Sequence, residues 1–230
     1  MNLKKLSHPR RPLSSYAKVQ ALVGTILRNR AFQLKRRRLR DLRYLDVGCG
    51  RNIHSEFVNM DHRWHPGIDV CWDITRGIPF SSKVMQGIFT EHCLEHFSLP
   101  QAVKLLRECH RILAPGGILR IVVPDGELYL KTYNQQVEGN IHVKFPFQDQ
   151  ESFREMYSPI LSINRIFYQD RDSIYGHRFI YDFHFLARLL GQCGFTSVTR
   201  RSFRVGADST LLIDSEMRAI ESLYVEASTG

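Results

Sequence analysis

The chain has 230 residues, of which 43% are hydrophobic and 24% are charged, and its formal net charge is +9. This length suits one α/β domain with additional segments, and the hydrophobic fraction is sufficient for a buried core. No run of about 18 apolar residues occurs, which excludes a membrane-spanning helix, and the N-terminus lacks the apolar stretch of a secretory signal. The five cysteines include no Cys-x-x-Cys pair, which indicates reduced thiols and a cytoplasmic protein.

The positive charge is concentrated in residues 1–43, a basic leader with 13 Lys or Arg and one acidic residue. Residues 44–230 hold 19 basic and 22 acidic residues and therefore carry a charge of −3. Apolar residues between Ala17 and Phe32 recur with the spacing of an amphipathic helix. Three interpretations stay open: a helix packed on the domain with a solvated basic end, a helix in peripheral contact with an anionic membrane, or an organellar transit peptide.

Residues 44–50 read Tyr-Leu-Asp-Val-Gly-Cys-Gly, a short buried strand that runs into a glycine turn. Glycines at alternate positions let the backbone bend sharply and approach a ligand closely. A helix N-terminus after such a turn would direct free N–H groups at an anionic ligand group. The pattern is one glycine short of the dinucleotide fingerprint, because Asn52 follows the second glycine. Taken alone, it also fits an ordinary α/β loop.

Apolar runs that end in a polar residue follow the glycine turn, over residues 57–61, 68–74 and 84–91. We expect a helix around residues 102–112, stopped by Pro115-Gly116-Gly117, and then a strand over residues 118–123. This alternation predicts a doubly wound, mostly parallel sheet. Ligands of such sheets bind beyond the carboxyl ends of the strands. The acidic residues at these ends should therefore line one edge: Asp61, Asp73, Glu91 and Asp125.

The second half of the chain is predicted to be helical over residues 127–138, and residues 140–178 then interrupt the alternation with aromatic residues and prolines. This stretch is either a crossover with a small core of its own or a lid that shapes a substrate pocket. A helix is expected to begin within residues 177–182 and to run through Leu190. Strands are expected over residues 195–203 and 222–227.

Together these segments resemble a class I, Rossmann-like S-adenosylmethionine-dependent methyltransferase. The resemblance covers residues 44–125 and rests on the glycine turn, on Glu-His-Cys-Leu-Glu-His-Phe at 91–97, on Pro-Gly-Gly at 115–117 and on Val-Pro-Asp at 123–125. The chain is most similar to small bacterial methyltransferases associated with surface-polysaccharide synthesis, which share a late His-(Lys/Arg)-Phe-x-Tyr-Asp segment, here at 177–182. The resemblance implies a seven-stranded sheet with helices on both faces and an antiparallel last strand. Residues 44–230 would form the methyltransferase domain, with 140–178 as a substrate-side insertion or lid.

The resemblance also implies S-adenosylmethionine as the cofactor and assigns its ligands. Asp46 would orient the methionine end, and Gly48 and Gly50 would let the backbone approach it. Glu91 or Thr90 would line the same end.

The remaining cofactor ligands implied by the resemblance follow the second and third strands. Asp61 would accept hydrogen bonds from the ribose hydroxyls, since a carboxylate is a pure acceptor. Asp73 would accept one from the adenine amino group, and the Ile74 amide would address a ring nitrogen. Gly50 and Asp61 are close in sequence, so the first crossover is short, which weakens the assignment of Asp61.

Methyl transfer from a sulfonium is an in-line displacement in which the protein supplies alignment and, for a hydroxyl acceptor, a base. A histidine suits this role because its pKa lies near neutrality. His92 is the first candidate, because it directly follows a strand, and His96 and His177 are further candidates. Structural roles are the alternatives for the last two, in a helix and in the hinge of a lid. Asp125 could orient a histidine or contact the acceptor.

We therefore expect an O-methyltransferase that acts on a hydroxyl of a glycan or a small molecule, without a metal. The basic leader motivates RNA or protein methylation as an alternative, although the charge of −3 on residues 44–230 does not favour nucleic acid as a partner. His92, Glu95 and His96 also fit a zinc-peptidase pattern, which requires a helix and a third ligand. A module that binds the cofactor without catalysis is the last alternative, motivated by Asn52 and the short crossover.

Overall fold

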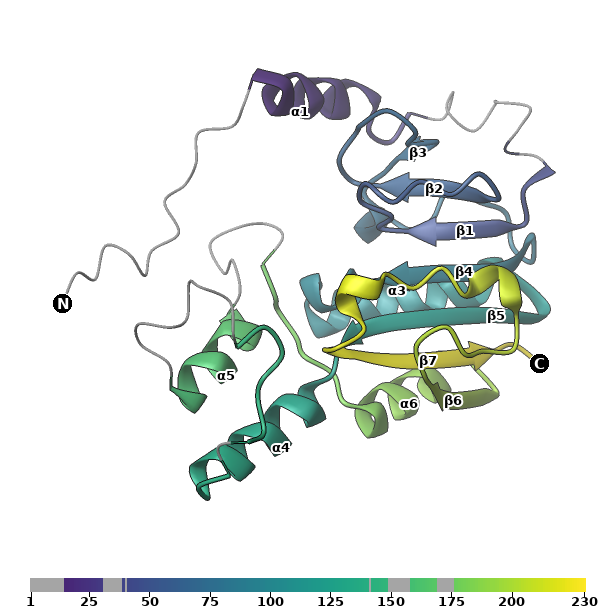
Figure 1. Cartoon of the computed structure of the whole chain (residues 1–230). Coiled ribbons are helices and arrows are strands. Elements are labelled where there is room, and N and C mark those ends of the chain that lie inside the picture. The colour runs from purple at the N-terminus through teal and green to yellow at the C-terminus, as the bar shows by residue number, and fades with distance from the viewer. Residues whose placement is uncertain (1–14, 31–38, 40, 141, 149–157, 169–175) are drawn as a thin grey trace.

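The computed structural model of the chain describes residues 15–30, 39, 41–140, 142–148, 158–168 and 176–230. Seven strands form one sheet in the order β3-β2-β1-β4-β5-β7-β6 (Figure 1). Strands β1 to β5 pair in parallel, and β7 runs antiparallel to both of its neighbours, β5 and β6. The predicted mostly parallel, seven-stranded sheet with an antiparallel last strand is confirmed, whereas the described helices do not cover both of its faces as predicted. The strands are β1 Tyr44–Val47, β2 Phe57–Asp61, β3 Val70–Cys71, β4 Met85–Glu91, β5 Leu113–Pro124, β6 Ser197–Arg201 and β7 Ser222–Ser228.

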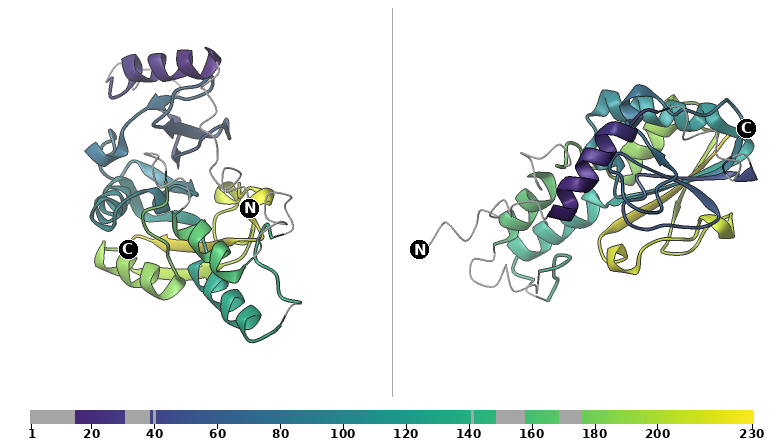
Figure 2. Two further views of the ribbon diagram at one scale, coloured as in Figure 1. Left: turned by 90° about the vertical axis from the view of Figure 1, so that its left-hand side faces the viewer. Right: turned by 90° about the horizontal axis from the view of Figure 1, so that it is seen from above.

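The α-helices are distributed unevenly around the sheet. Helices α3 and α6 cover one face, whereas α4 and α5 lie beyond the carboxyl ends of the parallel strands and α1 lies beside β3 (Figures 1 and 2). The helices are α1 Ser15–Leu27, α3 Leu99–Ile112, α4 Gly126–Val137, α5 Pro159–Tyr168 and α6 Phe183–Gln192. Four short 3-10 helices complete the described chain: η3 Ile74–Arg76, η4 Leu94–His96, η6 Ser209–Leu211 and η7 Glu216–Arg218.

Helix α3 shows how the sequence pattern produces the main core. Its N-terminus is closed by a capping box between Ser98 and Gln101, and its apolar residues all fall on one buried face: Ala102, Leu105, Leu106, Cys109 and Ile112. They pack against alternate residues of the central strands, such as Leu45, Ile88 and Leu119. Burial of each large aliphatic side chain stabilises the fold by roughly 1.5–3 kcal/mol.

The other face of the sheet carries no α-helix in the described part of the chain. Residues 202–215 of the connection from β6 to β7 cross it instead, and Leu211 packs there against Phe57, Phe89 and Tyr224. Figure 2 shows this connection opposite α3 and α6. The short first crossover explains the arrangement, because residues 48–56 between β1 and β2 form turns rather than a covering helix.

One buried arginine holds this connection on the sheet. The Arg120 side chain is fully buried on β5, and all five of its N–H groups donate hydrogen bonds. Nε and Nη2 donate to the two carboxylate oxygens of Asp214 at 2.8 and 2.5 Å, and Nη1 donates to Glu226 Oε1 at 3.1 Å. The other two bonds go to the carbonyls of Ser202 and Val205. Burial alone would lower the pKa of Arg120, but Asp214 and Glu226 together hold this pKa above its ordinary value.

Two helices, α6 and α1, begin or end at residues other than those predicted from the sequence. Residues 177–182 are extended rather than helical: Tyr181 bridges Asp125 at the end of β5, and α6 begins only after Asp182, whose carboxylate accepts from the Phe185 N–H. The prediction of a helix within 177–182 is therefore wrong, because this segment pairs with the edge of the sheet.

The leader helix is shorter than predicted. It ends at Leu27, because Asn29 takes a left-handed conformation (φ 60°) and its N–H donates to the Cys71 carbonyl. In the described chain, α1 approaches the domain through buried Gly24, while four large residues are exposed: Tyr16, Val19, Leu22 and Ile26. Residues 1–14 and 31–38 lie outside the described residues, and membrane contact stays a prediction. None of the described helices is long and apolar enough to cross a membrane.

Replacing Arg120 with Met should lower the free energy of unfolding by about 3–5 kcal/mol, because it leaves the buried carboxylate of Asp214 without its cation and Glu226 with Arg201 alone. Urea unfolding monitored by circular dichroism measures the change. Lys131→Met is the control, because it removes an ion pair with Glu127 in which the lysine is largely exposed, and it should change stability by no more than about 0.5 kcal/mol. Equal effects of the two substitutions would contradict the role given to Arg120.

Candidate functional site

The glycine turn follows β1 at the carboxyl edge of the sheet. Gly48 and Gly50 both have positive φ, at 76° and 57°, a conformation that L-residues with a Cβ rarely adopt. A Cβ on Gly48 would also lie 2.9 Å from the Cβ of Cys93 and still closer to its Sγ, whereas one on Gly50 would meet no atom within 4 Å. Gly48 is therefore required by packing as well as by conformation. At Gly50 only the direction of a Cβ is open, because its carbonyl contacts His65 Nε2 and its N–H donates to Asp61.

Asp61 lies directly beside this turn despite the short crossover. Its Oδ2 accepts a hydrogen bond of 3.0 Å from the Gly50 N–H, and its Oδ1 accepts one of 2.7 Å from the Arg63 N–H. Each oxygen retains a further lone pair. The structure thus brings together Asp61 and the glycine turn, as predicted for a cofactor site.

Asp73 and Ile74 follow β3 along the same edge. Asp73 caps η3, and its Oδ1 accepts from both the N–H and the hydroxyl of Thr75, at 3.1 and 2.6 Å. Both bonds use one oxygen and leave Oδ2 available to a ligand. Ile74 is the first residue of η3, and its N–H has no acceptor within the described residues.

Asp46, the penultimate residue of β1, and Glu91, the last residue of β4, line one small cavity. The cavity has a volume of about 20 Å³ and is lined by Asp46, Gly48, Cys49, Asn52, His54, Phe89, Glu91 and Ile213. Asp46 is 2% exposed. Burial, followed by the charges of Glu91 and Asp61, raises its pKa well above the ordinary value. The Glu91 carboxylate accepts from the N–H of Ser215 at 2.9 Å and from its hydroxyl. The connection from β6 to β7 therefore reaches the methionine side of the predicted site.

His92 follows β4 and takes a strained backbone conformation with φ 46°. Its Nε2 lies 2.8 Å from the Ser222 hydroxyl, and its Nδ1 lies 3.4 Å from Glu95 Oε1 and 4.0 Å from Glu221 Oε1. Burial, and then the charge of Arg218, lower the pKa of His92 to about 2. The imidazole is therefore neutral near pH 7, but a pKa this low makes it a weak base in this closed site, unlike the near-neutral histidine that the sequence predicts.

Glu95, His96 and His177 meet beside His92. Glu95 and His96 belong to η4, and the rings of His96 and His177 lie 5.2 Å apart. The Glu95 side chain is fully buried, and burial raises its pKa to about 8. Burial also lowers the pKa of His96, followed by the effect of His177. Sequence reasoning considered Glu95 only within the zinc-peptidase pattern, and that pattern does not fit: η4 starts at Leu94, so His92 is not on a helix with Glu95 and His96.

Asp125 lies at the same edge of the sheet, but both of its carboxylate oxygens already accept hydrogen bonds from other groups. Its Oδ1 caps α4 by accepting from the Glu127 and Leu128 N–H groups at 3.0 and 3.3 Å, and its Oδ2 accepts from Arg200 at 2.8 Å. Burial raises the pKa of Asp125, although these hydrogen bonds and the charge of Arg200 act to lower it. Within the described chain no histidine contacts Asp125, so its geometry indicates a structural role.

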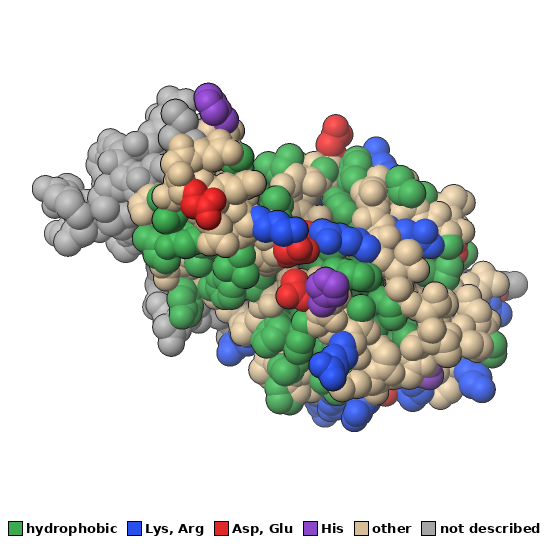
Figure 3. Space-filling view, turned by 90° about the horizontal axis from the view of Figure 1, so that it is seen from below, with side chains coloured by type: hydrophobic (Ala, Val, Ile, Leu, Met, Phe, Trp, Pro, Cys, Tyr) green, Lys and Arg blue, Asp and Glu red, His purple; other side chains and the backbone are tan. Residues whose placement is uncertain are grey.

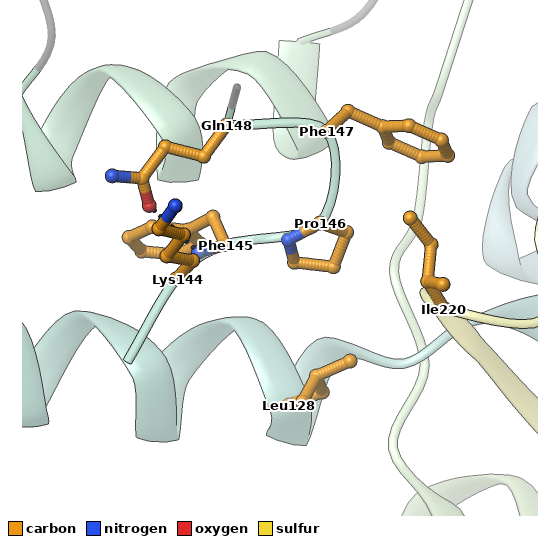
Figure 4. Close-up of a pocket in the computed structure, with 7 residues that line it drawn as sticks. All are labelled: Leu128, Lys144, Phe145, Pro146, Phe147, Gln148 and Ile220. Atoms are coloured by element: carbon orange, nitrogen blue, oxygen red, sulfur yellow. Dashed lines mark hydrogen bonds between the residues drawn. The ribbon is translucent and has the colours of Figure 1, made fainter. Parts of the chain in front are cut away.

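A larger cavity of about 550 Å³ opens between α4 and residues 144–148 (Figure 4). Phe147 and Ile220 face each other across it. The residues that line it are Leu128, Lys144, Phe145, Pro146, Phe147, Gln148 and Ile220. Glu221, next to Ile220, accepts from the Tyr129 hydroxyl at 3.0 Å and reaches His92, so it lies between this cavity and the histidine. The sequence indicated this region only through the aromatic residues of 140–178.

Comparison with known proteins identifies one family. A family model described as a methyltransferase domain matches residues 17–200, which is most of the chain. No protein of curated function matches the sequence significantly.

Several solved structures show a distant likeness. A SAM-dependent methyltransferase from Thermotoga maritima is 13% identical, with 82% of each chain covered and a TM-score of 0.47. One from Archaeoglobus fulgidus is 15% identical, with 94% of this chain and 100% of that chain covered and a TM-score of 0.45. The 1,6-didemethyltoxoflavin-N1-methyltransferase of Burkholderia thailandensis is 15% identical, with 94% and 82% covered and a TM-score of 0.45. Likeness at this level does not establish a shared function.

Alanine at position 48 should destabilise the protein more than alanine at position 50. Gly50→Ala adds only the cost of a left-handed residue, about 1–2 kcal/mol. Gly48→Ala adds to this the clash with Cys93, for a total of about 2–5 kcal/mol. Urea unfolding of both variants measures the difference, and Gly48→Ala combined with Cys93→Gly should recover part of the loss. If the two single variants are equally stable, the packing between Gly48 and Cys93 is not the constraint described.

Proposed function

The chain belongs to a family of methyltransferase domains, and from this premise we propose that it transfers a methyl group from S-adenosylmethionine to a hydroxyl of a glycan or small molecule. One observation carries the proposal: the carboxylates of Asp46, Asp61, Asp73 and Glu91 lie at or just beyond the carboxyl ends of four neighbouring strands, at the edge that carries the glycine turn. Ligands of doubly wound sheets bind at this edge.

The available polar groups fit the parts of this cofactor. The ribose diol pairs with Asp61, whose carboxylate is held at Gly50 and keeps further lone pairs. The adenine amino group pairs with Asp73, and the Ile74 N–H donates to a ring nitrogen. The open space over Gly50 lets the cofactor approach the backbone.

The methionine end fits the acidic side of the turn. Mutual repulsion with Glu91 and Asp61 adds to burial in raising the pKa of Asp46, so a cation beside these carboxylates is favoured. The ammonium and sulfonium groups of S-adenosylmethionine are such cations. The 20 Å³ cavity has room for only about one water. Cofactor binding therefore requires a shift of Ile213 and Ser215, which close the site against Glu91.

Asp73→Ala should weaken S-adenosylmethionine binding about 10- to 100-fold, because a hydrogen bond to a charged group contributes about 1.5–3 kcal/mol. Equilibrium dialysis with labelled cofactor measures the dissociation constant. Asp208→Ala is the matched control: Asp208 also caps a 3-10 helix, η6, and accepts from Thr210, but it lies away from the turn. Unchanged affinity in Asp73→Ala, or an equal loss in Asp208→Ala, would exclude Asp73 as a cofactor ligand.

His92 is the proton acceptor in this proposal. S-adenosylmethionine, when bound, supplies the electrophilic methyl group. The residues of the glycine turn would hold this methyl donor, and His92 would take the proton that the acceptor hydroxyl loses on methylation. Glu221 lies 4.0 Å from His92 Nδ1 but pairs with Arg218, and burial and the Arg218 charge oppose the imidazolium in the closed site.

His92→Gln should leave cofactor affinity unchanged and lower kcat about 10²- to 10⁴-fold, which is the usual contribution of a positioned base. The rate is followed as labelled methyl transferred to a hydroxyl acceptor. His184→Ala replaces an exposed histidine of α6 and serves as the control, with full turnover expected. A His92→Gln variant with wild-type kcat would rule out His92 as the base.

The 550 Å³ cavity is the proposed acceptor site. Its size and its apolar lining, with Lys144 and Gln148 as polar groups, suit one or two sugar rings or a small aromatic molecule. Glu221, next to the cavity residue Ile220, accepts from Tyr129 and lies 4.0 Å from His92 Nδ1, which supports an acceptor site on this side of the proposed base.

The charge distribution supports a small acceptor rather than a nucleic acid. On the face seen in Figure 3, Lys and Arg side chains lie among acidic and hydrophobic ones and form no continuous basic surface. Arg200, for example, pairs with Asp125 and Glu127. Nucleic acids bind to basic patches or stripes whose phosphate contacts dominate affinity.

A further inference from the structure

Three potential metal ligands converge next to His92. One ligand atom each from Glu95, His96 and His177 lies within 4.8 Å of the other two. The backbone fixes this arrangement, because the Glu95 carbonyl accepts from the Arg178 and Phe179 N–H groups at 2.8 and 3.2 Å. These bonds tie the segment that carries His177 to η4. The cluster is therefore built into the fold and does not depend on side-chain flexibility.

The Glu95 carboxylate lacks a partner that its burial requires. The side chain is 0% exposed, and neither oxygen accepts a hydrogen bond within the described residues. A buried carboxyl group without hydrogen bonds is costly in either protonation state, and a bound metal ion would stabilise its charged form. Arg218 could supply a compensating charge, but its guanidinium pairs with Glu221 at 2.8 Å instead. His92 Nδ1, at 3.4 Å from Glu95 Oε1, is near this carboxyl group but makes no hydrogen bond with it.

The two histidines are arranged as metal ligands usually are. His177 Nδ1 lies 2.6 Å from the Ile166 carbonyl, so the ring donates there and its lone pair lies on Nε2. In a metal-bound histidine, the ring nitrogen that does not bind the metal typically donates such a hydrogen bond to a carbonyl. His96 Nδ1 is buried and has no hydrogen-bond partner among the described residues, while its Nε2 lies 3.9 Å from Glu95 Oε1.

We propose that Glu95, His96 and His177 bind one divalent ion of the zinc class. Two imidazoles and one carboxylate are a donor set that Zn²⁺ accepts, whereas Ca²⁺ and Mg²⁺ take mainly oxygen ligands. Ligand atoms of tetrahedral zinc lie about 3.4 Å apart at the usual bond lengths, so the cluster needs to contract by roughly 1 Å. Three protein ligands leave one position for water or for an acceptor oxygen. The proposal differs from the peptidase pattern, because His92 Nε2 is bonded to Ser222 and is not a ligand.

Metal content and affinity of the full chain, purified without tag or chelator, test this site. Elemental analysis should give about one zinc per chain after incubation with zinc and gel filtration, and cobalt should produce a visible absorption band of a tetrahedral site. His177→Ala and Glu95→Gln should weaken zinc binding at least about 10-fold, the usual loss on disturbing such a site. His184→Ala, an exposed histidine outside the cluster, should bind as the wild type does.

Thermal unfolding separates loss of the site from loss of the fold. Zinc should raise the Tm of the wild type and of His184→Ala but not of His177→Ala, since a ligand stabilises only the state that binds it. Zinc binding by His177→Ala and Glu95→Gln as tight as in the wild type, or no retained metal in the folded wild type, would overturn the proposal. Cofactor binding, measured in the same preparation, tests the proposed function separately. A chain that binds S-adenosylmethionine but not zinc lacks only the metal site. A chain that binds zinc but not S-adenosylmethionine refutes only the proposed methyl transfer.

Discussion

The buried ion pair between Arg120 and Asp214 is the interaction on which the rest of this structure depends. A buried guanidinium and carboxylate are costly to desolvate, and here every N–H donor of the arginine is satisfied. Asp214 lies between Ile213 and Ser215, which line or close the acidic side of the glycine turn. A contact in the middle of β5 therefore determines how the cofactor edge is covered.

This arrangement solves a problem created by the short first crossover. In the absence of a covering helix after β1, the apolar residues of one sheet face need another cover, and the connection from β6 to β7 supplies it through Leu211. The same connection contributes Ser215 to Glu91 and ends at Glu221, near His92. One continuous segment thus covers the sheet, contacts Glu91 at the proposed cofactor edge and reaches the proposed base. Movement of this segment on cofactor binding would reach His92 directly.

Much of this fold follows from local patterns in the sequence. Helix α3 and the strands β1, β2, β4 and β5 appear as regular apolar periodicities, and parallel strands must bring Asp61, Asp73 and Glu91 to one edge. These features depend on residues close in sequence or on the topology of parallel sheets, so they can be predicted. The assignment of individual roles to these acids stays a prediction.

Other features depend on contacts between distant residues and were missed. Arg120 interrupts an apolar strand, which is a signal of a buried charge, but its partner is 94 residues away. The extended form of residues 177–182 depends on pairing with Asp125 and Glu95, which no local pattern reveals. The meeting of His177 with Glu95 and His96 has the same origin. Only the folded chain brings these three residues together.

The central claim is that the edge around Gly48, Gly50, Asp61 and Asp73 binds S-adenosylmethionine. Isothermal titration calorimetry of the full wild-type chain with this cofactor tests it most directly. The account predicts saturable binding of one cofactor per chain, and S-adenosylhomocysteine should compete for the same site. Absence of any binding heat at millimolar cofactor, with a chain shown to be folded by circular dichroism, would contradict the account.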